Sequence, residues 1–218
     1  MDASRGSRFI RATAHDPLGL AYRVMILSGC RRAELVGFRW AYADLEVPYR
    51  DPDTGGERLG AVLTVRRPVL QLGGRLHEEA TAKSRAGDRL VFLDHDTAGL
   101  LREHRKTQLR TRMAAEPSWH DNDLVFCQGD GRPWNPDYVS KRFRRLAGLA
   151  GVPVIKLHEG GRHTGNSLMY DAEIRQDIVM RQVGHASREI SQRYNHPLRQ
   201  AHLAAAAQVV GLVGRAGS

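Results

Sequence analysis

Cysteine and long apolar runs are both scarce in this sequence. Its 218 residues include two cysteines, Cys30 and Cys127, which stand far apart and form no Cys-x-x-Cys spacing. This pattern excludes a disulfide framework, indicates no zinc site and is typical of a reducing compartment. No apolar run approaches the length that spans a bilayer, and the first residues contain no apolar signal segment. We therefore expect a cytoplasmic protein.

Aromatic and acidic residues are also in short supply. Aromatic residues make up 6% of the chain, which argues against a protein that binds single strands by stacking their bases. The 24 acidic residues are outnumbered by 33 lysines and arginines, so the formal net charge is +9. A field of that sign favours polyanions, through phosphate neutralisation and counterion release. Charge alone also fits an ordinary basic protein, but duplex DNA is the partner that both observations favour.

Apolar periodicity predicts a mainly helical chain with a few strands. Helical patterns cover 17–27, 95–115, 136–150, 163–171, 175–183, 188–194 and 199–213, and a further helix begins near Arg32. Strand patterns cover 61–65 and 89–93, with a hairpin over 69–79 between them. We predict a mainly α (α+β) domain over residues 17–218, with a small antiparallel β-sheet at one edge. The polar residues 1–16 predict a flexible lead or the stub of a linker.

The stretch from Leu157 to His196, LHEGGRHTGNSLMYDAEIRQDIVMRQVGHASREISQRYNH, concentrates the side chains that suit phosphate chemistry. His158 and Arg162 come just before an apolar-periodic run, and His185 closes a second one. Arginine and histidine bind anionic oxygen clusters. Tyr194, nine residues after His185, is a possible covalent nucleophile that needs no metal. This stretch therefore predicts a phosphate-handling site.

Two further basic motifs precede that stretch. Arg31 lies in the segment LSGCRRAE, at an expected junction between two helices, and Glu34 would support it there. Lys83 lies in a basic turn before the strand over 89–93. Taken alone, each would more often be a solvated surface cation, so neither carries a function by itself.

Taken together and in this order, these motifs resemble the tyrosine recombinase (phage integrase) family. That family has an arginine in a T-G-x-R-x-x-E box, a lysine at a β-hairpin turn, an H-x-L-R-H-T box, an L-G-H box and a later tyrosine. The resemblance covers most of the chain and implies a helical catalytic domain that acts on double-stranded DNA without a cofactor or a metal. It implies these catalytic residues: Arg31, Lys83, His158, Arg162, His185 and Tyr194.

The resemblance also implies their roles. Tyr194 would attack the scissile phosphate, forming a 3′-phosphotyrosyl link and releasing a 5′-hydroxyl. Arg31 and Arg162 would bind the two non-bridging oxygens, because a guanidinium fork matches phosphate and stays charged. His158 would accept the tyrosine proton, since its pKa lies near working pH. Lys83 would protonate the departing 5′-oxygen.

His185 would donate a hydrogen bond to the phosphate, and His163 is assigned to structure. The sequence departs from the family in the segment between His158 and Arg162, which is one residue too long. Its two glycines either absorb the extra residue as a bulge, because glycine accepts positive φ, or leave His158 displaced. A second departure is the short N-terminal lead, which leaves no room for the family's N-terminal core-binding domain.

The predicted function is site-specific DNA recombination or integration, by strand cleavage and rejoining. Two alternatives stay open: a DNA-binding module with decayed catalysis, and DNA relaxation like that of a type IB topoisomerase. The family assembles as a tetrameric synapse on DNA, so self-association is expected. Two structural questions also stay open: whether the helix over 199–213 packs in cis or in trans, and whether the basic face of 136–150 lies on DNA.

Overall fold

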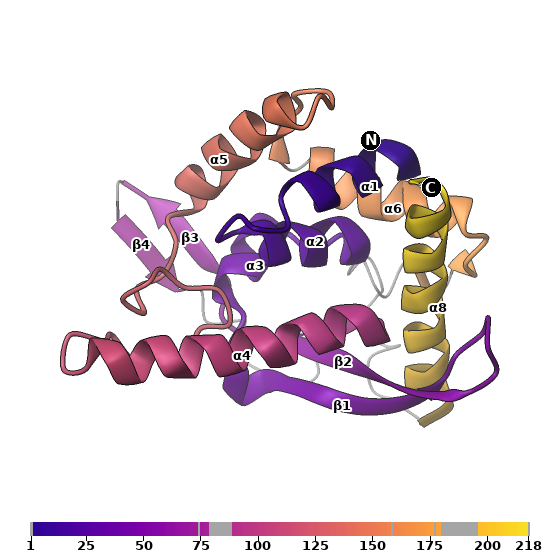
Figure 1. Ribbon diagram of the computed structural model, residues 1–218, viewed down its shortest axis with the longest axis horizontal. Coiled ribbons are helices and arrows are strands. Elements are labelled where there is room, and N and C mark those ends of the chain that lie inside the picture. The colour runs from indigo at the N-terminus through magenta and orange to yellow at the C-terminus, as the bar shows by residue number, and fades with distance from the viewer. Residues whose placement is uncertain are drawn as a thin grey trace.

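The computed structural model describes residues 2–73, 75–78, 89–157, 159–176, 178–179 and 196–217 (Figure 1). Its α-helices are α1 Ala3–Ala12, α2 Gly19–Ser28, α3 Arg32–Gly37, α4 His95–Ala115, α5 Pro136–Leu149, α6 Thr164–Asp171 and α8 His196–Arg215. A 3₁₀ turn, η1, covers Trp40–Tyr42, and a π-helical turn, η3, covers Glu159–His163. The strands are β1 Ala43–Arg50, β2 Glu57–Val65, β3 Val69–Leu72, β4 Arg75–Glu78 and β5 Arg89–Leu93.

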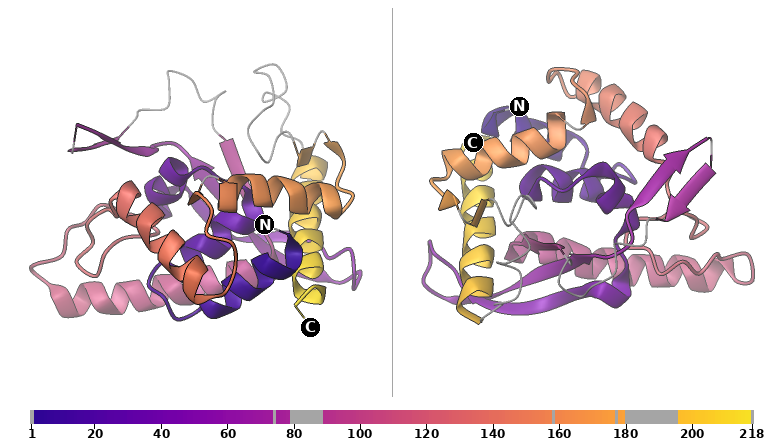
Figure 2. Two further views of the ribbon diagram at one scale, coloured as in Figure 1. Left: turned by 90° about the horizontal axis from the view of Figure 1, so that it is seen from above. Right: turned by 180° about the vertical axis from the view of Figure 1, so that it is seen from behind.

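The strands form two antiparallel units. The first is a three-stranded sheet of order β1-β2-β5, in which Ala43 pairs with Leu63, and Val62 with Phe92. The second is a ribbon of β3 and β4 that projects from the body of the molecule (Figure 2). The predicted fold, mainly helical with a small antiparallel sheet at one edge, is confirmed.

Helix α2 is the centre of the hydrophobic core. Its residues are buried on almost every side, and other helices surround it in Figures 1 and 2. Tyr22 of α2 meets Phe9 of α1 and Phe143 of α5, with ring centroids 5.8 and 5.5 Å away. Such aromatic pairs add specific geometry to the apolar area that they bury. The cluster fixes α1 and α5 against the same central helix.

The first residues correct one expectation. Residues 3–12 form helix α1 and not a flexible lead, because Phe9 is fully buried in the aromatic cluster and Asp2 caps the helix by accepting a hydrogen bond from the Arg5 amide. Burial of a Phe side chain contributes about 1.5–3 kcal/mol toward ordering this helix. Three arginines in the helix gave the segment a polar composition that concealed this contact.

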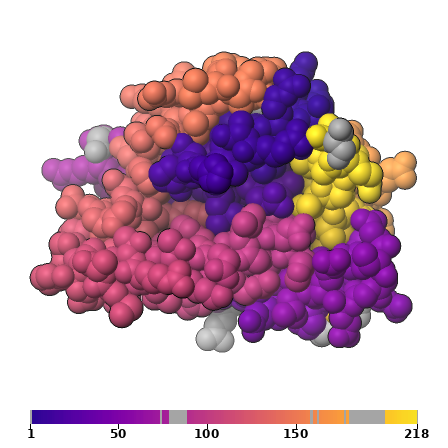
Figure 3. Space-filling model, viewed as in Figure 1, coloured from indigo at the N-terminus to yellow at the C-terminus, as the bar shows by residue number. Residues whose placement is uncertain are grey.

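Helix α8 packs in cis, against the same chain. Leu203 is fully buried, and Gln200 both donates to the Pro48 carbonyl and accepts from the Arg50 amide of β1. Its last turn is followed by Gly217, whose carbonyl accepts a 2.6 Å hydrogen bond from Arg11 of α1. The two termini therefore lie side by side, and α8 is held between α1 and the β1–β2 hairpin (Figure 3).

The described part of the chain contains no helix that is both long and apolar enough to cross a membrane.

Candidate phosphate-binding site

The junction between α2 and α3 presents Arg31 to solvent. Helix α2 ends at Gly29, which adopts a left-handed conformation (φ 64°) that favours glycine. Arg31 then caps α3, and its side chain is 51% exposed. Its backbone amide donates to Glu34 Oε2 at 2.6 Å, and its guanidinium donates to Glu34 Oε1 at 3.0 Å. Glu34 therefore orients the Arg31 side chain, and the exposed part of that side chain is accessible to a ligand.

Glu34 is the buried support of this arginine. Its side chain is 5% exposed and accepts a third interaction, from the guanidinium of Arg89 at the start of β5. A buried carboxylate is tolerated when cations and hydrogen bonds surround it, as they do here. The supporting role that the sequence predicts for Glu34 agrees with this geometry, and the arrangement joins the α2–α3 junction to β5.

Cys30, the residue before Arg31, is a core residue and not a nucleophile. Burial raises the pKa of its thiol to about 12, and the nearby negative charge of Glu34 adds to the effect. At neutral pH the thiol is therefore protonated and unreactive.

The second half of the site begins with η3, a π-helical turn in the segment that carries the extra residue. A π-helical turn contains one more residue than an α-helical turn, and such turns occur often at functional sites. Residues 159–163 form this turn, and the chain continues directly into α6 at Thr164. The structure describes the backbone of Arg162 in this turn and not its side chain.

The glycines of η3 are present for close packing. A Cβ atom at Gly160 would lie 2.5 Å from the Phe143 ring, and one at Gly161 would lie 2.6 Å from Met25 Cε. Neither glycine has a positive φ, so they do not form the positive-φ bulge that was one of the two alternatives left open by the sequence. A Cβ atom at either position would therefore require the neighbouring Phe143 or Met25 side chain to move.

Helices α2 and α6 touch through a pair of glycines, and this contact brings the two halves of the site together. A Cβ atom at Gly165 would lie 2.6 Å from the Gly29 nitrogen and 2.9 Å from the Ile26 carbonyl oxygen. Arg31 follows Gly29 by two residues, and Arg162 precedes Gly165 by three. The two predicted phosphate-binding arginines therefore come from elements that are in direct contact.

The other predicted site residues, Lys83, His158, His185 and Tyr194, lie outside the described residues. The chain on either side of Lys83 is anchored. Glu78 of β4 accepts from Arg39 at 2.5 Å and pairs with Arg67 at 3.5 Å, while Arg89 binds Glu34. Helix α8 begins two residues after Tyr194. His163 ends η3 with an exposed side chain.

Helix α5 carries a basic face, and the structure corrects which residues belong to it. Lys141, Arg144 and Arg145 are exposed. Arg142, which the sequence groups with them, instead binds the nearly buried Asp16 through two nitrogens, at 3.0 and 2.6 Å. The face that is open to a partner therefore consists of Lys141, Arg144 and Arg145.

Sequence reasoning missed two participants, Arg89 and Arg32. Arg89 was expected only as the first residue of a strand, and the basic turn just before it was the one available signal. Arg32, beside Arg31, turns away from Glu34 and contacts α5. Nothing in the local sequence distinguishes it from an ordinary surface arginine.

Within the described ranges, no group of three or more His, Cys, Asp or Glu residues is placed to hold a metal ion.

Comparison with known proteins identifies related sequences. The model of the phage integrase family matches residues 76–201. An integrase of Saccharopolyspora erythraea is 33% identical over 118 residues, which cover 54% of this chain and 27% of that protein. A tyrosine recombinase XerC-like protein of Caldanaerobacter subterraneus subsp. tengcongensis is 25% identical over 176 residues, which cover 78% of this chain and 43% of that protein. The chain spans less than half the length of these relatives.

Solved structures have the same fold at low sequence identity. The crystal structure of XerA recombinase matches with a TM-score of 0.61 and 18% identity, over 91% of this chain and 61% of that chain. The Tn1549 transposon integrase, in complex with transposon right end DNA, matches with a TM-score of 0.63 and 17% identity, over 86% of this chain and 58% of that chain. These likenesses establish the architecture.

Proposed function

Because this chain belongs to the phage integrase family, we propose that it is a tyrosine-type site-specific DNA recombinase, an integrase. It cleaves and rejoins double-stranded DNA through a 3′-phosphotyrosyl intermediate. We further propose that residues 1–218 contain the catalytic domain, with α1 as an integral part of it.

The observation that carries the proposal is the contact between Gly29 and Gly165. It sets the exposed Arg31 next to the turn that bears Arg162. Two arginines that come from touching elements would suit one phosphodiester, whose two non-bridging oxygens share a negative charge. Preorganised cations that face a developing charge stabilise the transition state without reorganisation.

The reaction exchanges one phosphoester bond for another. The Tyr194 hydroxyl attacks phosphorus and transfers its proton to His158, and the bond between phosphorus and O5′ breaks. Lys83 protonates the departing oxygen, which leaves as a 5′-hydroxyl, and His185 donates a hydrogen bond to the phosphate. Since the phosphotyrosyl link retains the bond's energy, a 5′-hydroxyl can reverse the step without ATP. Cationic side chains supply the charge, so we propose no cofactor or metal.

The exposed face of α5 extends the proposed contact with DNA. Lys141, Arg144 and Arg145 present three cations on the helix that packs on η3 through Phe143. Phosphate contacts of this kind position a protein on the duplex without reading its sequence.

Self-association on DNA and a cytoplasmic location complete the proposal. Strand exchange requires cleavage of more than one strand, so several copies would assemble on DNA, as a tetrameric synapse in the form expected of the family. Cytoplasmic DNA is the substrate that such a protein would meet.

The test is covalent trapping on nicked duplex DNA. Because the target site is unknown, a pool of nicked duplexes is incubated with the protein at low salt and resolved on a denaturing gel. We expect a DNA band shifted by a covalent adduct, and no such band with Tyr194→Phe.

The trapping assay, together with assays of plasmid relaxation and of strand exchange between two duplexes, separates the alternatives. DNA binding without an adduct from the unsubstituted chain would favour a binding module with decayed catalysis. An adduct accompanied by plasmid relaxation, without exchange between two duplexes, would favour a relaxing activity. Adduct formation together with exchange supports the recombinase.

A further inference from the structure

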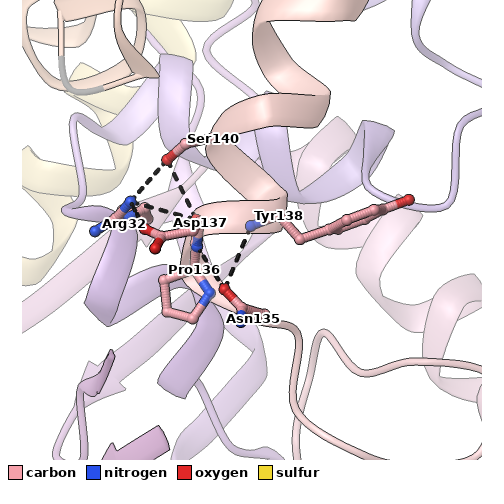
Figure 4. Close-up of polar contacts among 6 residues, drawn as sticks. All are labelled: Arg32, Asn135, Pro136, Asp137, Tyr138 and Ser140. Atoms are coloured by element: carbon pink, nitrogen blue, oxygen red, sulfur yellow. Dashed lines mark hydrogen bonds and ion pairs between the residues drawn. The ribbon is translucent and has the colours of Figure 1, made fainter. Parts of the chain in front are cut away.

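Arg31 and Arg32 begin α3 side by side and contact different parts of the molecule. Arg31 binds Glu34 on its own helix. Arg32 instead reaches the first turn of α5, about a hundred residues later in the sequence (Figure 4). Successive residues at a helix start point in different directions, because each residue advances the helix by about 100°. The two arginines therefore connect the α2–α3 junction, which carries Arg31, to helix α5.

One guanidinium nitrogen of Arg32 lies near three acceptors of α5. Nη1 is 2.8 Å from Ser140 Oγ, 3.1 Å from Asp137 Oδ1 and 3.4 Å from the Pro136 carbonyl oxygen. Ser140 directs its own hydroxyl proton to the Pro136 carbonyl at 3.2 Å, which leaves its lone pairs to accept from Arg32. Because Nη1 carries two hydrogens, at least one of them is shared between two of these acceptors.

The backbone that carries the acceptors of Arg32 is fixed by a cap at the start of α5. Asn135 caps α5 by accepting from the amides of Asp137 and Tyr138, and Pro136 begins the helix with its φ already fixed. The positive end of the α5 dipole opposes a cation at this position, so the carboxylate of Asp137 is the group that makes the contact favourable. Removing Asp137 should consequently release Arg32.

Helix α5 touches both elements that bear the predicted phosphate-binding arginines. Arg32 links it to α3, and Phe143 packs against the Gly160 backbone of η3. The contact is also solvated, since the side chains of Arg32 and Asp137 are 40% and 56% exposed. A pair so exposed contributes little to the free energy of unfolding. A role in placing helices fits these facts better than a role in stability.

We propose that Arg32 is a positioning residue for strand cleavage, acting through Asp137 and Ser140 to fix α5 relative to Arg31 and η3. This inference rests on the proposed function. Reactive groups displaced by about an ångström can lose on the order of a hundredfold in rate. Loss of the contact should therefore slow cleavage while leaving folding and DNA affinity nearly intact.

The experiment measures two quantities for each variant: the midpoint of DNA binding, and the rate of adduct formation at saturating nicked DNA. The variants are Arg32→Ala, Asp137→Ala, their combination and Arg32→Lys. Each single alanine variant should lower the rate about tenfold or more, with a binding midpoint within about threefold of the unsubstituted chain. The combination should be no slower than either, because both remove one contact. Lysine should restore part of the rate, since it keeps the charge without the planar fork.

The chain offers a matched control in Arg112 and Asp121. Their nitrogen and oxygen lie 2.9 Å apart, their side chains are 38% and 56% exposed, and they join the C-terminal part of α4 to the loop that follows it. Arg112→Ala and Asp121→Ala should leave the rate of adduct formation unchanged. Melting curves of all variants check that none has lost its fold.

Three outcomes would overturn the inference. If Arg32→Ala weakens DNA binding while Asp137→Ala changes nothing, Arg32 contacts DNA directly. If the Arg32 and Asp137 variants form adduct as fast as the unsubstituted chain, the contact positions nothing. If the unsubstituted chain forms no adduct, the proposed function fails, and the positioning role fails with it.

Discussion

At the scale of single residues, Glu34 is the group on which the most interactions of the site converge. Its buried carboxylate accepts from the Arg31 amide and from the guanidinium groups of Arg31 and Arg89. Glu34→Gln would remove the buried negative charge that Arg31 and Arg89 share, which should cost about 3 kcal/mol in the free energy of unfolding. Denaturant titration measures this loss. Glu103→Gln, in an exposed pair with Lys106, is the control and should not shift the denaturation midpoint.

His104 should give the protein a pH-dependent stability. Its Nε2 atom lies 2.7 Å from the Val125 carbonyl oxygen, and burial lowers its pKa below the ordinary value of 6.5. The unfolded chain therefore binds a proton more readily than the folded one. The free energy of unfolding should fall as pH drops below about 6.5, and keep falling until the folded-state pKa is reached.

Melting temperatures of the protein and of His104→Gln between about pH 7.5 and 5.5 measure this contribution. Glutamine can donate to the same carbonyl and does not titrate, so the substituted chain should lose less stability over that interval. Equal losses in the two proteins would show that other groups cause the pH dependence.

At the scale of elements, the contact between α2 and α6 has the least room for change. A Cβ atom at Gly165 would collide with backbone atoms of Gly29 and Ile26. Backbone atoms cannot relieve such a collision by changing rotamer, as a flexible side chain can. Gly165→Ala should destabilise the fold by about 3 kcal/mol and, by separating Arg31 from η3, should abolish adduct formation. Gly129→Ala is the matched control, because no atom lies within 4 Å of its Cβ position and its φ is not positive. An active Gly165→Ala protein would show that the two elements need not touch.

The sequence predicted elements best where local signals were strong. Helix α5 begins at Pro136 after an Asn135 cap, as expected from that dipeptide. Helix α4 covers the expected residues, but its cap is Asp94 and not His95 or Asp96, because Asp94 accepts from the amides of Asp96 and Thr97. Helix α1 was missed, since its order depends on Phe9 meeting residues far along the chain.

Contacts between distant residues also explain what the sequence could not reveal about the site. The motif pattern indicated Arg31 and Arg162 by resemblance, but their proximity depends on a glycine pair that no periodicity marks. The role of Gly160 and Gly161 stayed open for a related reason: a glycine needed for close approach and one needed for positive φ look alike in a sequence. The contact of Arg32 with Asp137, far apart along the chain, had no local signal.

At the scale of the whole molecule, the net charge of +9 predicts salt-dependent DNA binding. Each cation that neutralises a phosphate contributes about 0.9 to the slope of log affinity against log salt concentration. If the α5 face contacts DNA, replacing Lys141, Arg144 and Arg145 together by alanine should lower that slope by nearly three.

The control removes the same charge from α4, which lies on the opposite side of α2 from α5 (Figure 1). Alanine at the exposed Arg105, Lys106 and Arg110 should change the slope by much less. Similar slopes for the two triple variants would mean that overall charge, and not the α5 face, sets DNA affinity.

The central claim is that Arg31 and Arg162 bind one scissile phosphate. Its most direct test is adduct formation by Arg31→Ala and Arg162→Ala on nicked DNA that carries an uncharged methylphosphonate at the scissile position. A neutral linkage does not need the cations, so both variants should form adduct faster there than on ordinary DNA, while Tyr194→Phe should form none on either. Failure to recover adduct in both arginine variants, or recovery in only one of them, would contradict a shared phosphate.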